Sequence, residues 1–259
     1  MTMQSPFHPG ERAVQARVGV RDKAEVLGQR MIRDVMPDEH REFYATLPYL
    51  FVGSVDHRGQ PWASMLFGRP GFANAPDAKT LDVAAGPIFG DPLRDNLAVD
   101  ARLGVLGIDY ATRRRNRLNG RVRNAQTKGF TVEVEQAFGN CPRFIQKRTV
   151  EVTDRIEQAS DTLPVTDMNA LNVRAREIIA AADHFFIATY YSADQDDRNQ
   201  GADLSHRGGK SGFVRIDSDR RLTFPDFRGN NHYNTLGNLE LNPRAGLLFP
   251  DFDTGALLY

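Results

Sequence analysis

The chain has 259 residues, a length that suits two domains of about 100–150 residues each. Hydrophobic residues make up 41% and charged residues 25% of the sequence, which is ordinary for a globular protein and argues against extensive disorder. Lysine plus arginine equals aspartate plus glutamate, at 33 each, so no basic excess favours a phosphate backbone. We therefore do not expect nucleic acid as a partner.

A single cysteine, Cys141, leaves no partner for a disulfide within the chain, which fits a reducing compartment. Residues 1–30 are charged and lack the apolar core of a signal peptide, and no apolar run approaches the roughly 20 residues that cross a membrane. We expect a cytoplasmic protein that does not bind membranes. The six histidines show no metal-ligand spacing, so no metal is expected.

The predicted elements begin with a helical N-terminal extension over residues 1–36. A helix over Pro37–Thr46 then leads directly into a strand over Tyr49–Val55, and this arrangement recurs as a helix over Asp167–Ala182 and a strand over Phe185–Tyr191. Further short strands, at close spacing and with few helices between them, suggest a closed or partly closed barrel. These strands are predicted over Phe130–Ala137, Phe213–Ile216, Arg221–Phe224 and Ala245–Phe249.

The basic run Arg113–Arg117 has two interpretations. It is either a solvated hairpin tip or a contact for an anion or a partner.

Part of the sequence repeats in the same order. The matched positions are Phe51–Ser54 with Phe186–Thr189, Ser64 with Ser205, Gly71-Phe72 with Gly212-Phe213, Asn96-Leu97 with Asn238-Leu239, and Asp109 with Asp251. Most of the difference in spacing falls in the polar stretch Ser192–Gln200, which reads as a loop. The series predicts a duplicated unit with a first copy at 37–150, a linker at 151–165 and a second copy at 166–259. The second copy stops at Tyr259, inside a predicted strand, so we expect a fragment or a barrel that lacks its last strands.

Two segments of the second copy, Ser205–Phe213 and Phe224–Leu236, are dense in glycine, hydroxyl, amide and cationic side chains. A phosphate monoester needs this mixture of positive charge and N–H and O–H donors. The alternative is two loops rich in turn-forming residues with solvated charges.

The stretches Ser-His-Arg-Gly-Gly from Ser205 and Phe-Pro-Asp-Phe-Arg-Gly-Asn from Phe224, followed by Asn-Pro-Arg-Ala-Gly from Asn242, resemble the pyridoxamine 5'-phosphate oxidase-like flavoproteins. The resemblance covers most of residues 37–259 and is closest to a tandem-copy subgroup often fused to reductase modules. It implies a β-rich α+β fold made of two tandem FMN-binding split β-barrels with short flanking helices, the second truncated at its C-terminus.

The resemblance also implies a cofactor, FMN, and residues that bind it. Ser205, Arg207 and Lys210 would lie near the phosphate and flavin, Asp226 and Arg228 near the ribityl chain or ring edge, and Asn234 and Thr235 in the phosphate cradle. Oxidases of the family usually carry a basic pair in place of these last two residues. The full set of cofactor-binding candidates is Ser205, His206, Arg207, Lys210, Asp226, Phe227, Arg228, Asn234, Thr235, Asn140 and Cys141.

The first copy has lost part of this set. It keeps Ser64 but has Leu66 where the second copy has Arg207, and Pro92-Leu93 where the second has Asn234-Thr235. Barrels of this family pair face to face around the flavin, so the first copy would supply the opposite wall.

The segment Phe138–Gln146 is the candidate for that wall. Asn140 predicts a helix cap that places Cys141 at the positive helix end. Both are either structural or in contact with flavin across the interface.

We therefore expect an FMN-dependent oxidoreductase or electron-transfer domain, with catalytic residues unassigned. Its partners would be a small-molecule substrate or electron donor, and a reductase partner or fused module; whether two chains pair stays open. One alternative is a haem-handling split barrel with His206 or His232 as axial ligand. The other is a non-catalytic interaction module.

Overall fold

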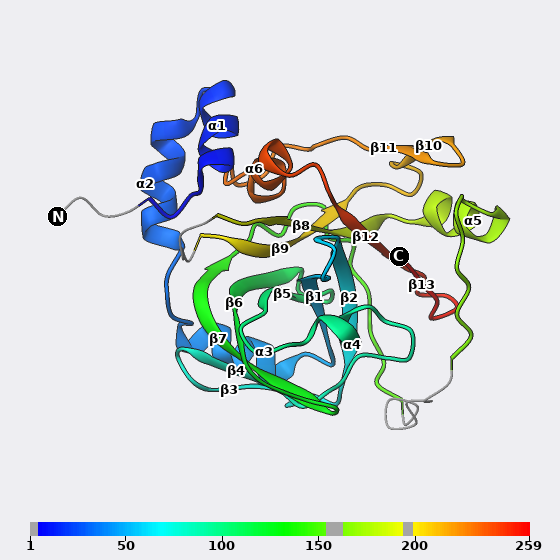
Figure 1. The fold of residues 1–259 in the computed structure, drawn as a ribbon, viewed down its shortest axis with the longest axis horizontal. Coiled ribbons are helices and arrows are strands. Elements are labelled where there is room, and N and C mark those ends of the chain that lie inside the picture. Colours follow the sequence, from blue (N-terminus) through cyan, green and yellow to red (C-terminus); the bar gives the residue numbers. More distant parts are fainter. Residues whose placement is uncertain (1–4, 154–162, 194–198) are drawn as a thin grey trace.

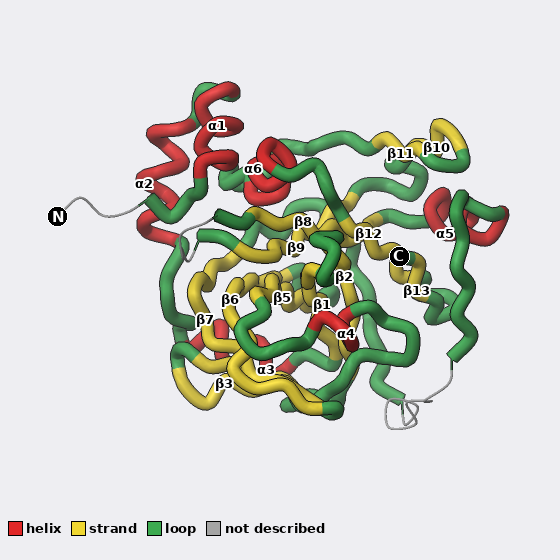
Figure 2. Tube along the Cα trace, viewed as in Figure 1, coloured by secondary structure: helices red, strands yellow, loops and turns green. Residues whose placement is uncertain are grey.

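The computed structural model describes residues 5–153, 163–193 and 199–259. In these residues the fold is β-rich, with antiparallel sheets and few helices, and is consistent with a split-barrel-like architecture. Figures 1 and 2 show a large curved sheet lying beneath a smaller one. Much of the predicted linker 151–165 and of the predicted loop at Ser192–Gln200 lies outside the described residues.

The larger sheet, built from the first half of the chain, has seven strands. In order across the sheet they are β2 (Pro61–Phe67), β1 (Tyr49–Val55), β5 (Arg102–Asp109), β6 (Arg114–Gln126), β7 (Gly129–Gly139), β4 (Thr80–Val83) and β3 (Ala73–Asp77). The strand predicted over Phe130–Ala137 is confirmed within β7, where Phe130, Val132 and Val134 are buried in the main apolar cluster. Helices α3 (Asp38–Thr46) and α4 (Leu93–Asn96) pack against the same cluster, so the sheet encloses a core of its own.

The smaller sheet, built from the second half, has four strands in the order β13 (Leu257–Leu258), β12 (Gly246–Pro250), β8 (His184–Tyr191) and β9 (Gly201–Gly208). The strands predicted over Phe213–Ile216 and Arg221–Phe224 correspond to β10 (Arg215–Ser218) and β11 (Arg221–Thr223), which pair as an antiparallel hairpin. Helix α5 (Val173–Ala181) is shorter than the predicted Asp167–Ala182. It begins late because the Asn172 side chain caps it, accepting a hydrogen bond from Ala175 N–H at 2.8 Å.

The two sheets pack face to face through a shared apolar cluster. Phe51 of β1 stacks on Phe186 of β8, the residue matched to it in the sequence, with ring centroids 3.7 Å apart. Gly104 and Gly246 have the same spacing in the sequence as the matched Asn96 and Asn238, and they allow equivalent close approaches. A Cβ would lie 2.9 Å from the Ala202 carbonyl oxygen at Gly104 and 2.2 Å from that of Pro61 at Gly246. A unit packed on its own copy about a two-fold axis would make such reciprocal contacts. The duplication itself remains a prediction.

The N-terminal extension folds onto the second half of the molecule. Helix α1 (Pro9–Arg17) packs against α6 (Asn234–Leu241), and α2 (Arg21–Met31) packs against α1, as Figure 1 shows. Among the residues described, none of the helices combines the length and the apolar character that a bilayer crossing requires.

Candidate functional site

A polar hollow of about 110 Å³ lies where the first sheet meets β9 and the beginning of α6. Its first-half residues come from β5, β6 and the segment after β7, and its second-half residues from β9, the loop after β11 and the first turn of α6. All the predicted cofactor residues except Lys210 line this hollow. They are Asn140, Cys141, Ser205, His206, Arg207, Asp226, Phe227, Arg228, Asn234 and Thr235.

Lys210 lies outside the hollow. It is exposed in the turn after β9, where its carbonyl oxygen accepts a hydrogen bond from Phe213 N–H at 3.0 Å. Lys210 therefore does not join the other residues that were expected to surround a phosphate.

Arg117 of β6 joins the two halves at the hollow, with its side chain 4% exposed. Its Nη1 donates to Asp203 Oδ1 at 2.6 Å and to Asn234 Oδ1 at 3.1 Å. Its Nη2 donates to Ser205 Oγ at 2.6 Å and to the Leu204 carbonyl oxygen. Burial raises the pKa of Asp203, and the charge of Arg117 opposes that rise. Additional hydrogen bonds offset part of the cost of burying an ion pair, and these four hold the guanidinium in one orientation while leaving its Nε–H without a partner among the described residues.

Two more arginines, Arg115 and Arg207, line the hollow beside Arg117. Burial lowers the pKa of Arg115 to about 10, so this guanidinium stays charged at neutral pH. Its Nη1 lies 3.4 Å from His206 Nδ1. Arg207 Nη1 donates to Asp226 Oδ1 at 2.6 Å, and burial lowers the pKa of Arg207 as well. Both charges therefore lie where water solvates them poorly.

Each of these three arginines carries a buried Nε–H group that no described residue pairs. An unsatisfied buried donor costs about 1–3 kcal/mol, and more when it is charged. The arginines also outnumber the carboxylates bonded to them, Asp203 and Asp226. Surplus positive charge with spare N–H donors is the arrangement that binds an anion such as a phosphate monoester.

The first turn of α6 adds backbone donors to the hollow. The helix begins with Asn234 and Thr235, and the first N–H groups of a helix have no intrahelical acceptor and favour anions. Thr235 Oγ1 donates to Ser205 Oγ at 2.9 Å, which ties the helix to β9. Asn231 and Tyr233, just before the helix, have φ of 64° and 62°, a left-handed conformation that is strained for non-glycine residues and recurs at ligand sites.

Aromatic rings lie at the mouth of the hollow. Phe227 stacks on Phe144 with ring centroids 4.8 Å apart, and the two are 41% and 40% exposed. Asn230 Nδ2 donates to Asn140 Oδ1 at 3.2 Å and joins this loop to the first half. Exposed flat faces beside a cationic hollow offer a stacking surface to a planar ring.

The predicted helix at Asn140 is wrong. Asn140 N–H donates to the Arg115 carbonyl oxygen at 3.1 Å, which extends the pairing of β6 with β7, and no helix follows over residues 140–148. Cys141 is half-buried in this non-helical segment, so it does not lie in the first turn of a helix of its own.

Arg115 and Arg117 line the hollow but are not among the predicted cofactor residues, and a solvated hairpin tip was one of two interpretations of their run. The tip ends at Arg113, which has φ of 61°, and β6 begins at Arg114. Residues two apart on a strand point to the same face, and that alternation was the available signal. For Arg115 and Arg117 the geometry favours the other interpretation, contact with an anion.

Buried histidines border the hollow. His206 stacks on His184 with centroids 5.3 Å apart, and His232 lies between Phe7 and Phe138 at 5.5 and 5.7 Å. Burial lowers the pKa of His206 well below its ordinary value and that of His232 to about 4, so both rings are neutral at pH 7. Among the residues described, no three His, Cys, Asp or Glu side chains group closely enough to hold a metal ion.

The matched region in the first half is occupied by a side chain of the protein itself. Ser64, matched to Ser205, donates to Asp91 Oδ1 at 2.6 Å, and Leu93 N–H donates to the same oxygen at 2.8 Å. Tyr259 OH donates to Asp91 Oδ2 at 2.6 Å. Burial raises the pKa of Asp91. In the first half, the Asp91 carboxyl group thus accepts the hydrogen bonds of Ser64 and Leu93 N–H. The matched residues of the second half, Ser205 and Thr235, line the open hollow instead.

No family model and no curated protein matches the chain. Among solved structures, HupZ from Group A Streptococcus is similar over 40% of this chain and 93% of that chain, at 16% identity and a TM-score of 0.32. The FAD- and heme-binding protein from Mycobacterium smegmatis is similar over 57% of this chain and 96% of that chain, at 14% identity and a TM-score of 0.28. Likenesses at these TM-scores establish neither a ligand nor an activity for this chain.

Proposed function

We propose that this chain is an FMN-binding flavoprotein of the split-barrel type, an oxidoreductase or electron-transfer domain that holds FMN between its two halves. The observation that carries the proposal is the convergence of three arginines with buried Nε–H groups, Arg115, Arg117 and Arg207, on one hollow at the start of α6. FMN ends in a phosphate monoester, which requires fixed cations and N–H donors.

The phosphoryl group fits the inner part of the hollow. Arg117 and Arg115 supply charge there, and Ser205 and Thr235 supply hydroxyl groups. At about 110 Å³ the hollow is smaller than the about 300–1,000 Å³ of pockets that enclose a drug-sized ligand. It would therefore enclose the phosphoryl end, and the ribityl chain and ring would extend towards the mouth.

The mouth offers groups suited to the rest of the cofactor. Asp226 and Arg228 can exchange hydrogen bonds with ribityl hydroxyls, and the exposed ring of Phe227 can cover one face of a flavin. Asn140 and Cys141 would contact the cofactor from the first half. Bound FMN would supply the redox chemistry, while the chain binds it, orients it and sets its electrostatic surroundings.

The duplication belongs to the same proposal. Two copies of one unit packed face to face create two related sites, and we infer that this chain keeps one of them open and fills the other with Asp91. The remaining partner would be a small-molecule substrate or an electron donor, including a reductase partner or fused module.

The absorption spectrum of the purified protein tests the proposal. We expect flavin bands, and we expect Arg207→Ala to weaken FMN affinity about tenfold or more, since a hydrogen bond from a charged group contributes about 1.5–3 kcal/mol. Lys210→Ala is the matched control, because it removes one positive charge outside the hollow. Equal FMN retention in both variants, or a wild-type protein that stays colourless with added FMN, would contradict the proposal.

The same spectra address the alternatives. A Soret band on addition of haem, lost in His206→Ala, would favour the haem-handling split barrel. A protein that takes up neither cofactor would favour an interaction module.

A further inference from the structure

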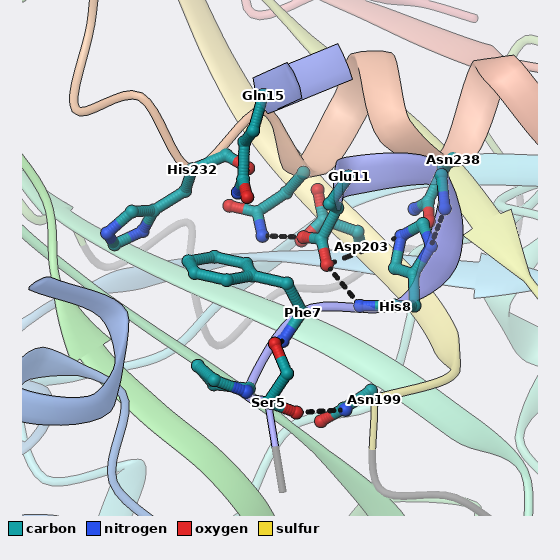
Figure 3. Close-up of polar contacts among 12 residues, drawn as sticks. Ser5, Phe7, His8, Glu11, Gln15, Asn199, Asp203, His232 and Asn238 are labelled. Carbon is teal, nitrogen blue, oxygen red and sulfur yellow. Dashed lines mark hydrogen bonds and ion pairs between the residues drawn. The ribbon is translucent and has the colours of Figure 1, made fainter. Parts of the chain in front are cut away.

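The N-terminal helix α1 places a buried carboxyl group next to the hollow. Glu11 is 3% exposed, and its Oε2 accepts a hydrogen bond from His8 N–H at 2.8 Å. Its Oε1 accepts one from Asn234 Nδ2, in the first turn of α6. Figure 3 shows Glu11 extending from α1 towards Asp203, the carboxylate that pairs with Arg117. The extension thus supplies a group to the network behind the hollow.

The position of Glu11 is fixed by close packing of α1 on α6. A Cβ at Gly10 would lie 2.1 Å from the Gly237 carbonyl oxygen, and one at Gly237 would lie 2.5 Å from Glu11 N, so the two helix backbones are in contact. Gln15 Nε2 also donates to the His232 carbonyl oxygen at 3.0 Å, just before α6. The carboxyl group of Glu11 has little freedom to move away from Asn234.

The direction of the hydrogen bonds links Glu11 to the cation of the hollow. A guanidinium can only donate, so Asn234 turns its Oδ1 to Arg117 Nη1, at 3.1 Å. The amide nitrogen of Asn234 must then face an acceptor, and Glu11 Oε1 is that acceptor. Glu11 therefore sets the orientation of Asn234, and Asn234 is one of the groups that hold Arg117.

We propose that Glu11 is a positioning residue of the anion hollow: it orients Asn234 and thereby fixes Arg117 for an anionic ligand. The N-terminal helices are then part of the site. The identity of the ligand as FMN rests on the proposed function, whereas the effect of Glu11 on anion binding does not.

The charge of Glu11 gives this role a dependence on pH. Burial raises the pKa of Glu11 to about 8, and hydrogen bonds from the His8 backbone and Asn234 oppose the rise. The charged or titratable groups that face it are Asp203, Arg117 and His8, whose Nε2 lies 3.6 Å from Glu11 Oε2. Ionisation above about pH 8 adds a second carboxylate beside Asp203 and offsets the charge of Arg117. Anion affinity should therefore fall as pH rises through about 8.

The test measures the affinity of the full chain for FMN and for inorganic phosphate between about pH 6.5 and 9.5. At pH 7 we expect Glu11→Ala to weaken both about tenfold, because Asn234 loses its acceptor. Glu11→Gln keeps one acceptor and stays neutral, so its affinity should vary less than about twofold over this range, while that of the wild type falls about tenfold. Glu240→Gln, which removes the Glu240–Arg17 pair between α6 and α1, is the matched control and should follow the wild type.

Each outcome decides the inference. If FMN binds but Glu11→Gln shows the wild-type pH profile, or Glu240→Gln reproduces the Glu11 variants, the positioning role is overturned and the proposed function stands. If only phosphate binds, and with the expected Glu11 dependence, the inference stands and the FMN proposal fails. If neither probe binds the wild type, both fail. If Glu11→Ala does not fold, the pH profile of Glu11→Gln decides.

Discussion

The hollow of the second half and its counterpart in the first half are built from matched elements, yet one is lined by guanidinium groups and the other holds a buried carboxyl group. Ser205 accepts hydrogen bonds from Arg117 and Thr235, whereas Ser64 donates its hydroxyl hydrogen to Asp91. Matched backbone positions can therefore hold a serine beside either an arginine or an aspartate. The neighbouring side chain determines whether the serine hydroxyl accepts a hydrogen bond from a guanidinium or donates one to a carboxyl group.

In both regions the deciding contact crosses between the halves. Arg117 extends from β6 of the first half to Ser205 of the second, and Tyr259 extends from the second half to Asp91 of the first. If the repeat is continued along the chain, Tyr259 takes the place of Arg117. At this position the guanidinium of Arg117 can bind an anion, whereas the phenol of Tyr259 donates a hydrogen bond to the carboxyl group of Asp91. The site is therefore a property of the pair of halves.

Removing Arg117 should have the largest effect on stability and on FMN binding. Arg117→Ala leaves Asp203 buried without its cation, which costs about 3–5 kcal/mol in the free energy of unfolding, and FMN binding should be lost. Urea denaturation and FMN titration measure the two effects. Arg123→Ala, an exposed arginine of the same strand, should change stability by no more than about 1 kcal/mol.

A second variant identifies the cause of that loss. Adding Asp203→Asn to Arg117→Ala removes the uncompensated charge and should restore part of the stability but none of the binding. If Arg117→Ala is as stable as Arg123→Ala and still binds FMN, Arg117 does not organise the hollow.

Acid should act mainly on the second half. His232 is buried with its pKa lowered to about 4, and the matched position in the first half is Gly90. The unfolded chain binds a proton near the ordinary histidine pKa, so His232 contributes stability above about pH 6.5 that is lost as pH falls towards about 4. The loss is up to about 3 kcal/mol.

Unfolding free energies measured across this pH range check the assignment. His232→Gln should make the loss of stability at low pH smaller, with the remainder due to His206 and His184, whose pKa values burial also lowers. Exposed His57→Gln should leave the profile unchanged. Identical profiles in the two variants would place the acid sensitivity elsewhere, with His206 as the next candidate.

The smallest effect is expected from the counterpart region. Asp91→Asn keeps one acceptor for the donors of Ser64, Leu93 and Tyr259, so it should cost about 1–2 kcal/mol in stability. FMN affinity should stay within about twofold of the wild type, because among the residues described Asp91 shares no contacts with the proposed FMN site and substitutions at such separate sites act independently. A large loss of FMN affinity in this variant would mean that the counterpart region also takes part in binding.

Much of the second-half part of the hollow could be predicted from the sequence. Ser205 and Arg207 share a strand face, and Asn234 and Thr235 follow a segment of the same composition, so local pattern and resemblance placed them together. Arg115 and Arg117 could not be placed with certainty, because a basic run beside a turn is locally the same whether water or another sheet covers it. The covering sheet decides their burial.

Two other features depend on contacts that no local pattern records. The helix expected at Asn140 gives way to an extension of β-pairing with Arg115, on the neighbouring strand. Glu11 meets Asn234 across 223 positions of sequence, and nothing near residue 11 points to it. Short helical segments and long-range polar contacts are set by packing, which overrides local propensity.

Titration of the protein with FMN and with riboflavin, which lacks the phosphate, is the most direct test of a phosphate-binding hollow. We expect one FMN per chain, competition by inorganic phosphate, and affinity for riboflavin at least about tenfold weaker. Equal affinity for FMN and riboflavin, or no binding of either, would contradict the assignment of Arg115, Arg117 and Arg207 to the phosphoryl group.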